Sequence, residues 1–156
     1  MTPILLTWNL PAKKAAKARM LAMRSGVRVA AVETWQYLQP LGSFTGDCGS
    51  MESLYDGAGF SEEMLLFAHF PETLLSRFLQ SWKTTGLPPV ALKAVLTDTN
   101  RDWNSLELHE QLVEERDSIR RGLRPKGHDA PEETHSAQGF CRNCQNLHLT
   151  FVEYAL

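Results

Sequence analysis

The sequence predicts an α/β protein in which two β-α-β repeats form one four-stranded sheet packed with helices. When the chain is laid against itself with a shift of about sixty residues, two segments match. The matched positions pair residues 4–6 with 64–66, Pro11 with Pro71, and Gly26 with Gly86. In both segments an apolar run precedes a helical pattern and a second apolar run follows it, the order typical of a β-α-β unit. We therefore expect repeats at residues 4–34 and 64–97, within a single domain of residues 1–122.

The first strand of each repeat differs from the second in its hydrophobic pattern. The apolar runs at residues 4–6 and 64–67 are unbroken, which is typical of central strands that are covered on both faces. The second strands, which start at Val27 and Val90, alternate apolar with charged residues. This alternation predicts flanking strands with a partly solvated face.

Each repeat also contains a helix that begins near a proline and ends at a glycine. Pro11 and Pro71 suit a first helical turn, where the missing N–H costs nothing. Gly26 and Gly86 can take the positive φ that closes a helix. The second helix has a broad apolar stripe, consisting of Leu74, Leu75, Phe78, Leu79 and Trp82. The first helix has a smaller apolar face, and its basic residues, Lys13, Lys14, Lys17 and Arg24, are expected mostly outside.

A third helix is predicted after the second repeat. Asn104 and Glu107 have capping-box spacing, and Gly122 ends the helical pattern. The glutamates of this helix, including Glu115, are expected on a solvated face. Residues 42–59 are rich in glycine and should form loops, with one helical turn at residues 51–55. Residues 123–156 are expected to form a flexible C-terminal tail, because their first half is rich in Pro, Gly and charge and has no periodicity.

The relation between the two repeats is left open by the sequence. Parallel pairing of the two strands within each repeat follows from the crossover rule. The linker between the repeats is long enough for parallel repeats, which give a doubly wound sheet, or antiparallel repeats, which give a ferredoxin-like α+β sandwich. The unbroken central runs favour a sheet covered on both faces.

Composition limits the classes of partner and compartment. The chain has 156 residues, of which 43% are hydrophobic and 22% charged, as in ordinary globular proteins. Its net charge of -2 gives no global reason to approach nucleic acid or an anionic membrane, so neither partner is expected. The N-terminal segment lacks the basic region and the long apolar run of a signal peptide, which predicts a cytoplasmic protein. Three cysteines, an odd number, are expected to remain reduced.

Four stretches of the sequence form a recognisable set, namely residues 4–6, 37–42 and 63–70, and the run from Leu92 through Asn100 and Trp103 to Leu108. Together they resemble the bacterial domain-of-unknown-function 3783 family. The resemblance extends from about Ile4 to Glu115 and is sharpest at Lys93-Ala94-Val95-Leu96-Thr97. It implies a fold and a bacterial cytosolic context. It implies no catalytic residues, because the family has no assigned activity.

The best candidate site is the turn after the last strand. Thr97, Asn100 and Trp103 follow the carboxyl end of that strand, where open α/β sheets usually bind ligands. Tyr37 and Gln39 occupy the corresponding place in the first repeat, so the two loops are expected to line one cleft. Such a cleft suits a small polar molecule or a protein partner. The structural alternative is that the polar side chains satisfy the turn and that Trp103 fills the core.

Three functions are compatible with these residues. The leading hypothesis is a non-catalytic ligand-binding or regulatory and interaction module without a cofactor. The second is a small enzyme that uses His69 or a thiol such as that of Cys48. The third is a zinc site in the tail that recruits a partner. Cys141, Cys144 and His148 have metal-ligand spacing, but a closed site needs a fourth ligand, so no metal is expected.

Overall fold

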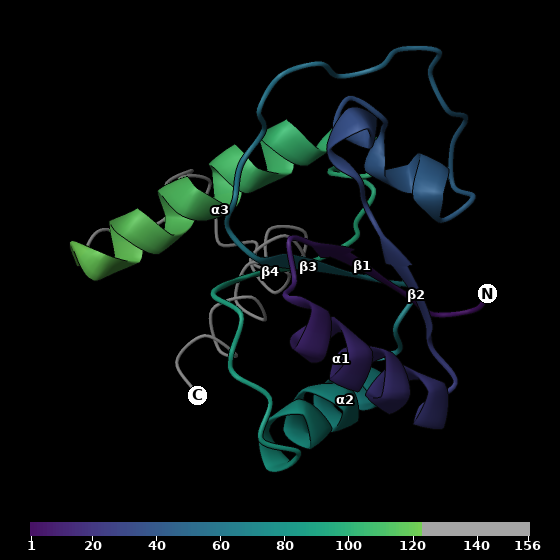
Figure 1. Cartoon of the computed structure of the whole chain (residues 1–156), viewed down its shortest axis with the longest axis vertical. Coiled ribbons are helices and arrows are strands. Elements are labelled where there is room, and N and C mark those ends of the chain that lie inside the picture. Colours follow the sequence, from purple (N-terminus) through teal and green to yellow (C-terminus); the bar gives the residue numbers. More distant parts are fainter. Residues whose placement is uncertain (123–156) are drawn as a thin grey trace, which may run out of the picture.

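The computed structural model describes residues 1–122 of the chain and contains a sheet, three α-helices and two short 3-10 helices (Figure 1). The first β-α-β unit consists of β1 (Ile4–Trp8), α1 (Ala12–Arg24) and β2 (Arg28–Ala31). The 3-10 helices η1 (Thr34–Gln36) and η2 (Leu41–Phe44) follow. The second unit consists of β3 (Met64–Ala68), α2 (Glu72–Thr84) and β4 (Leu92–Val95), and the last helix is α3 (Ser105–Arg120).

The four strands form one mixed sheet in the order β2-β1-β3-β4. Strands β1 and β2 are parallel, as are β3 and β4, whereas the central strands β1 and β3 are antiparallel and pair Leu6 with Leu66. The predicted four-stranded α/β fold, with two central and two flanking strands, is therefore confirmed. The units run antiparallel, but the ferredoxin-like alternative does not apply, because that topology splits each β-α-β unit and here the two strands of each unit are neighbours.

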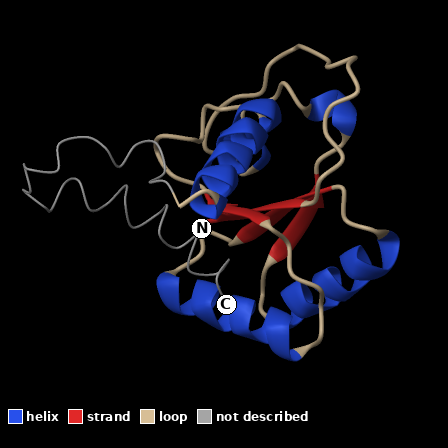
Figure 2. Ribbon diagram, turned by 90° about the vertical axis from the view of Figure 1, so that its left-hand side faces the viewer, coloured by secondary structure: helices blue, strands red, loops and turns tan. Residues whose placement is uncertain are grey.

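Helices cover both faces of the sheet (Figure 2). Helices α1 and α2 lie side by side on one face, while α3 and the segment with η1 and η2 lie on the other. Right-handed crossovers explain why α1 and α2 lie on the same face of the sheet. The two antiparallel units are related by a rotation about the normal to the sheet, and such a rotation leaves both crossover helices on one face. Alternate residues of the central strands pack into the two hydrophobic cores, one on each face of the sheet. Leu5 and Leu65 pack with α1 and α2, and Leu6 and Leu66 pack with α3.

The caps of the helices follow the sequence signals. Gly26 and Gly86 have φ of +73° and +81° after α1 and α2, as expected for residues that close a helix. The predicted capping box at the start of α3 is confirmed, since Asn104 Oδ1 accepts from Glu107 N–H and Glu107 Oε1 accepts from Asn104 N–H. In the described part of the chain, no helix combines the length and apolar character needed to cross a membrane.

Three local predictions were wrong. The helical turn expected at residues 51–55 is absent, and η1 and η2 form earlier in the linker instead. Lys14 is buried rather than outside, because its ammonium forms an ion pair with Glu63 and lies 3.4 Å from the carbonyl oxygen of Pro89. Glu115 is only 2% exposed and not part of a solvated face.

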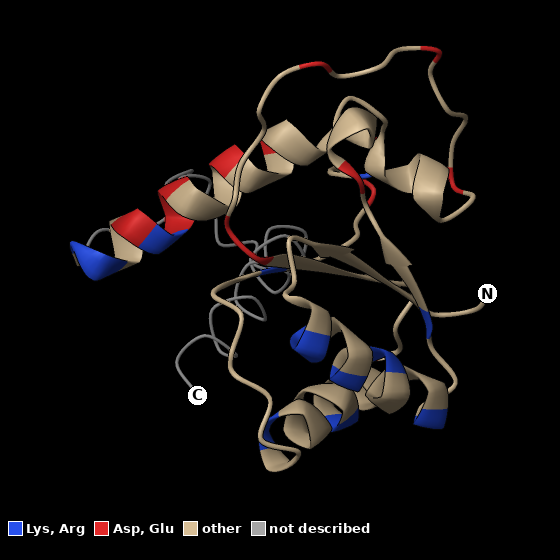
Figure 3. Cartoon of the chain, in the orientation of Figure 1, with Lys and Arg blue, Asp and Glu red and all other residues tan. Residues whose placement is uncertain are grey.

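Charge divides the molecule into two sides (Figure 3). Residues 1–32 contain six Lys and Arg side chains and no Asp or Glu. Residues 33–63 contain six Asp and Glu side chains and no Lys or Arg. The side formed by α1 and α2 is therefore basic, and the opposite side, which carries the linker, is acidic. The small net charge of the whole chain hides this separation.

Candidate functional site

The structure places the two predicted loops next to each other and joins them by backbone hydrogen bonds. Leu41 N–H donates to the carbonyl oxygen of Trp103 at 2.8 Å, and Gly42 N–H donates to that of Arg101 at 2.8 Å. Ser105 N–H donates to the carbonyl oxygen of Tyr37 at 3.1 Å. The loops therefore pack directly against each other along this line.

Asn100 organises the second loop from inside. Its side chain is 8% exposed. Its Oδ1 accepts from Thr97 N–H at 2.8 Å, and its Nδ2 donates to the carbonyl oxygen of Val95 at 3.0 Å. Thr97 Oγ1 accepts from Asn100 N–H at 3.2 Å. Both ends of the Asn100 amide thus bind backbone groups of the turn. The Trp103 side chain is half-buried and packs against the hydrophobic core that includes residues of α3.

Replacing Asn100 with alanine should lower the free energy of unfolding by about 1.5 kcal/mol, because the change removes two part-buried hydrogen bonds to the backbone of Thr97 and Val95. Urea denaturation measures this value. The exposed neighbour Thr99, replaced with alanine, is the matched control and should leave stability unchanged. An Asn100 variant as stable as the control would contradict the structural role of the amide.

Tyr37 and Gln39 hold the first loop together in different ways. The buried Tyr37 ring stacks between Tyr55 and Phe60, with ring centroids 5.8 Å and 4.8 Å apart. The Gln39 amide reaches across the linker, where Oε1 accepts from Met51 N–H at 2.8 Å and Nε2 donates to the Met51 carbonyl oxygen at 2.7 Å. Gln39 Nε2 also lies 3.2 Å from the carbonyl oxygen of Ser53. These bonds fix residues 51–53 opposite η1.

An open groove of about 540 Å³ lies between η1 and residues 50–54. Of the predicted site residues that the structure describes, only Gln39 lines it. Three large apolar side chains in its walls are strongly exposed, namely Trp35 at 52%, Met51 at 51% and Leu54 at 72%. Tyr55 N–H donates to the carbonyl oxygen of Trp35 at 3.0 Å and ties the two walls together. We call this feature the linker groove. Sequence reasoning missed it, because apolar residues in a loop without periodicity give no signal of exposure.

Glu62 anchors the end of the linker to α3. Its carboxylate lies 2.8 Å from Arg116 Nη1 and 2.9 Å from His109 Nε2. The hydrogen bond from Arg116 lowers the pKa of Glu62, and the hydrogen bond with His109 lowers it further. Burial raises the pKa, but by less. The His109 ring in turn stacks on Phe60, with centroids 3.9 Å apart. The linker is therefore held at Phe60 and Glu62 as well as at Gln39.

The structure pairs His69 with a carboxylate that the sequence did not suggest. His69 follows β3 with a φ of +61°, and its Nε2 lies 2.8 Å from Asp47 Oδ2. The two groups are close enough for an ion pair, but their geometry does not meet the criteria for a hydrogen bond. The Asp47 carboxylate also accepts from the hydroxyl of Thr45, and the neighbouring Cys48 has its Sγ 3.9 Å from the carbonyl oxygen of Arg101. His69, Asp47 and Cys48 thus share the end of the molecule where β3 and β4 finish.

The candidates Cys141, Cys144 and His148 lie outside the described residues. Within residues 1–122, no group of three or more His, Cys, Asp or Glu side chains has an arrangement that could hold a metal ion.

The comparisons with known proteins give a family match. Residues 63–119, which span β3 to α3, match the family model described as Domain of unknown function (DUF3783). Neither curated proteins nor solved structures gave a match to this chain. The matched segment contains His69, Asn100 and Trp103 but not the linker groove. The β3-α2-β4-α3 part of the chain therefore matches the domain-of-unknown-function 3783 family that the sequence resembles.

Proposed function

We propose that this protein is a non-catalytic interaction module that binds a short segment of a partner protein in the linker groove. The observation that carries the proposal is the set of three exposed apolar side chains, Trp35, Met51 and Leu54, around one groove. Exposed tryptophan is enriched among residues that dominate binding energy at protein interfaces. A soluble domain has no folding reason to keep three large apolar side chains together at its surface.

The chemistry of the partner segment follows from the charge around the groove. The linker carries Glu33, Glu52 and Asp56 and no basic residue. A segment with one or two large apolar side chains flanked by Lys or Arg complements both the apolar walls and the acidic surroundings. The bonds of the Gln39 amide hold the walls in place before binding, which lowers the entropy cost of association.

The experiment is a selection from a displayed library of random peptides with the full chain, followed by measurement of the dissociation constants of the selected peptides. We expect peptides rich in large apolar residues next to Lys or Arg. Trp35→Ala should weaken their binding at least about tenfold, because it removes the largest apolar surface of the groove. The measurement is fluorescence anisotropy of labelled peptide.

Met20 and Met23 provide the matched control. They are 56% and 73% exposed on α1, on the other face of the sheet, and their replacement by alanine should leave peptide binding unchanged. Circular dichroism would verify that the Trp35 variant remains folded. Selected peptides that bind the Trp35 and the methionine variants equally well would refute the assignment to the linker groove.

A second candidate function is a small enzyme that uses His69, and one observation favours it. Asp47, 2.8 Å from His69 Nε2, supplies the carboxylate that orients a histidine acting as a general base. The thiol of Cys48 follows in the chain and is the nearest nucleophile in sequence. If this reading is right, Cys48 reacts with iodoacetamide more slowly in the His69→Ala and Asp47→Asn variants. Equal rates in all three proteins would remove the support for catalysis.

Two broader statements belong to the same proposal. We infer that the units at residues 4–34 and 64–97 are copies of one repeated module, supported by their equal element lengths of 5, 13 and 4 residues. We also place the protein in the bacterial cytosol, where its odd number of cysteines would remain reduced.

A further inference from the structure

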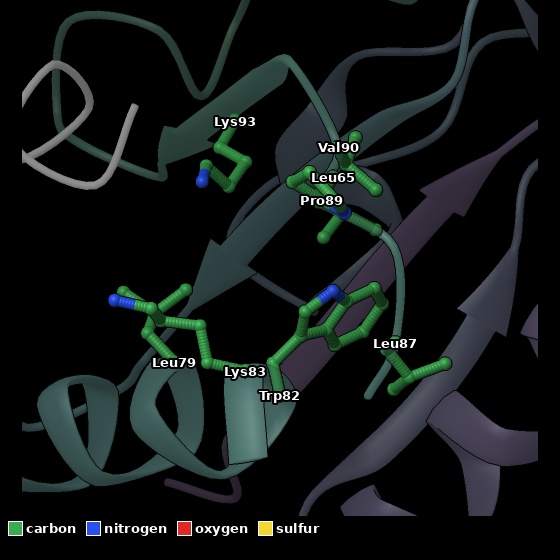
Figure 4. A pocket seen from close by; sticks show the side chains of 8 residues that line it. All are labelled: Leu65, Leu79, Trp82, Lys83, Leu87, Pro89, Val90 and Lys93. Atoms are coloured by element: carbon green, nitrogen blue, oxygen red, sulfur yellow. The ribbon is translucent and has the colours of Figure 1, made fainter. Parts of the chain in front are cut away.

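A second pocket lies on the opposite face of the sheet from the linker groove, between α2 and β4 (Figure 4). Its volume is about 220 Å³. Its apolar wall consists of Leu65, Leu79, Trp82, Leu87, Pro89 and Val90. Two lysines, Lys83 and Lys93, also line the pocket, and within residues 1–122 no acidic side chain contributes to the lining.

The pocket arises from a difference between the two units. In the first unit β2 begins two residues after Gly26, whereas in the second β4 begins six residues after Gly86. The extra residues include Pro88 and Pro89, whose rings stiffen the connection. Trp82 Nε1–H donates to the carbonyl oxygen of Pro88 at 3.0 Å, which fixes the indole against this connection.

The two lysines reach the pocket from different elements. Lys83 is exposed in the last turn of α2, and Lys93 is half-buried on the edge strand β4. Figure 4 shows both side chains on one side of the pocket, across from Leu87. Their stems contribute apolar surface while their ammonium groups stand at its border. The surrounding side of the molecule is the basic one, which further favours an anion.

We propose that this pocket binds a small amphipathic carboxylate with a compact apolar body, such as a single aromatic ring on a short arm. A cavity of about 150 Å³ holds benzene, so the space available here matches one ring and a short substituent. The ring packs against Trp82 and Leu65, and the carboxylate lies at the lysine border. The proposal is independent of the interaction proposed for the linker groove.

Three probes of nearly equal size test the proposal on the full chain. They are phenylacetate, which is anionic, 2-phenylethanol, which is neutral, and phenethylamine, which is cationic. Binding is followed by NMR of ¹³C-labelled methyl groups and of the Trp82 indole N–H. We expect phenylacetate to bind with a dissociation constant of about 1 mM, given its roughly ten heavy atoms. The shifted signals should be those of Leu65, Leu79, Leu87, Val90 and Trp82, and phenethylamine should bind most weakly.

A pair of variants separates the charge from the apolar contacts. Lys83→Met keeps an apolar stem and removes the ammonium group, so it should weaken phenylacetate binding roughly fivefold and leave 2-phenylethanol binding unchanged. Lys17→Met removes an exposed lysine of α1 as the matched control and should change neither. Phenethylamine binding as tightly as phenylacetate, no binding of phenylacetate at millimolar concentration, or shifts confined to residues outside the pocket would each overturn the proposal.

Discussion

Replacing Gly59 with alanine is expected to lower the free energy of unfolding by about 3 kcal/mol, the largest effect we anticipate for a single substitution in the linker. Gly59 has a φ of +69°, which is strained for any residue with a Cβ. An added Cβ would also lie 2.5 Å from Cε2 of Tyr37. The Tyr37 ring has little room to yield, because it is buried between Tyr55 and Phe60. Urea denaturation measures the change.

Two other glycines separate the causes of this loss. Gly46 has a φ of +87° but no atom within 4 Å of an added Cβ, so Gly46→Ala should show only the backbone strain, about 1 kcal/mol. Gly49 has neither a positive φ nor a close neighbour, and Gly49→Ala should leave stability nearly unchanged. If Gly59→Ala cost no more than Gly46→Ala, the aromatic stack would be looser than its geometry indicates.

The Gly59 substitution also connects stability with the proposed function. The Tyr37 stack includes Tyr55, whose N–H is bonded to the carbonyl oxygen of Trp35 in the wall of the linker groove. Displacing the Tyr37 ring should therefore disturb the groove walls. Peptides selected on the original chain are expected to bind the Gly59→Ala protein less well even below its unfolding temperature.

The regular part of the fold is readable from local patterns. The unbroken runs containing Leu5 and Leu65 identify central strands, because both faces of a covered sheet need apolar residues. Gly26 and Gly86 mark helix ends, since a positive φ there suits glycine. The antiparallel relation of the two units has no such local cause. It depends on how β1 pairs with β3 across a long linker, so the sequence leaves it open.

The site depends on contacts that local patterns do not encode. His69 and Asp47 are 22 positions apart and meet only because the linker folds back over the end of the sheet. Asn100 was expected to satisfy its turn or to bind a ligand, and its amide is bound to the turn backbone on both sides. The exposure of Trp35 is equally hidden, because nothing in a loop sequence distinguishes an apolar residue that covers the core from one that faces solvent.

The burial of Glu115 leads to the second large expected effect, a gain of stability. Glu115 Oε1 accepts from Gln111 Nε2 at 3.0 Å, but Oε2 has no hydrogen-bond partner among the described residues. Desolvation by burial raises the pKa of Glu115, and the nearby charge of Glu114 adds to this against the opposing hydrogen bond from Gln111. The charged carboxylate thus opposes folding at neutral pH.

Glu115→Gln should raise the free energy of unfolding at pH 7 by about 2 kcal/mol, because the amide keeps the bond with Gln111 and carries no charge. This gain in stability should be present at neutral pH and disappear as the pH falls. The pKa of Glu115 in the folded state lies above its unfolded value of 4.5. As the pH falls through the folded pKa, the buried carboxylate takes up a proton, and the free-energy cost of burying its charge disappears. The two proteins should therefore become equally stable at and below the unfolded pKa.

Unfolding by urea at pH 7 and again near the unfolded pKa of Glu115 tests both parts of this prediction. Glu110→Gln is the matched control, since Glu110 is exposed on the same helix and its neutralisation should change stability little at either pH. A Glu115→Gln protein that is less stable than the original at pH 7 would mean that the buried carboxylate is held by a charged partner. In that case Glu115 would stabilise α3 in its ionised form, and stability would fall rather than rise on acidification.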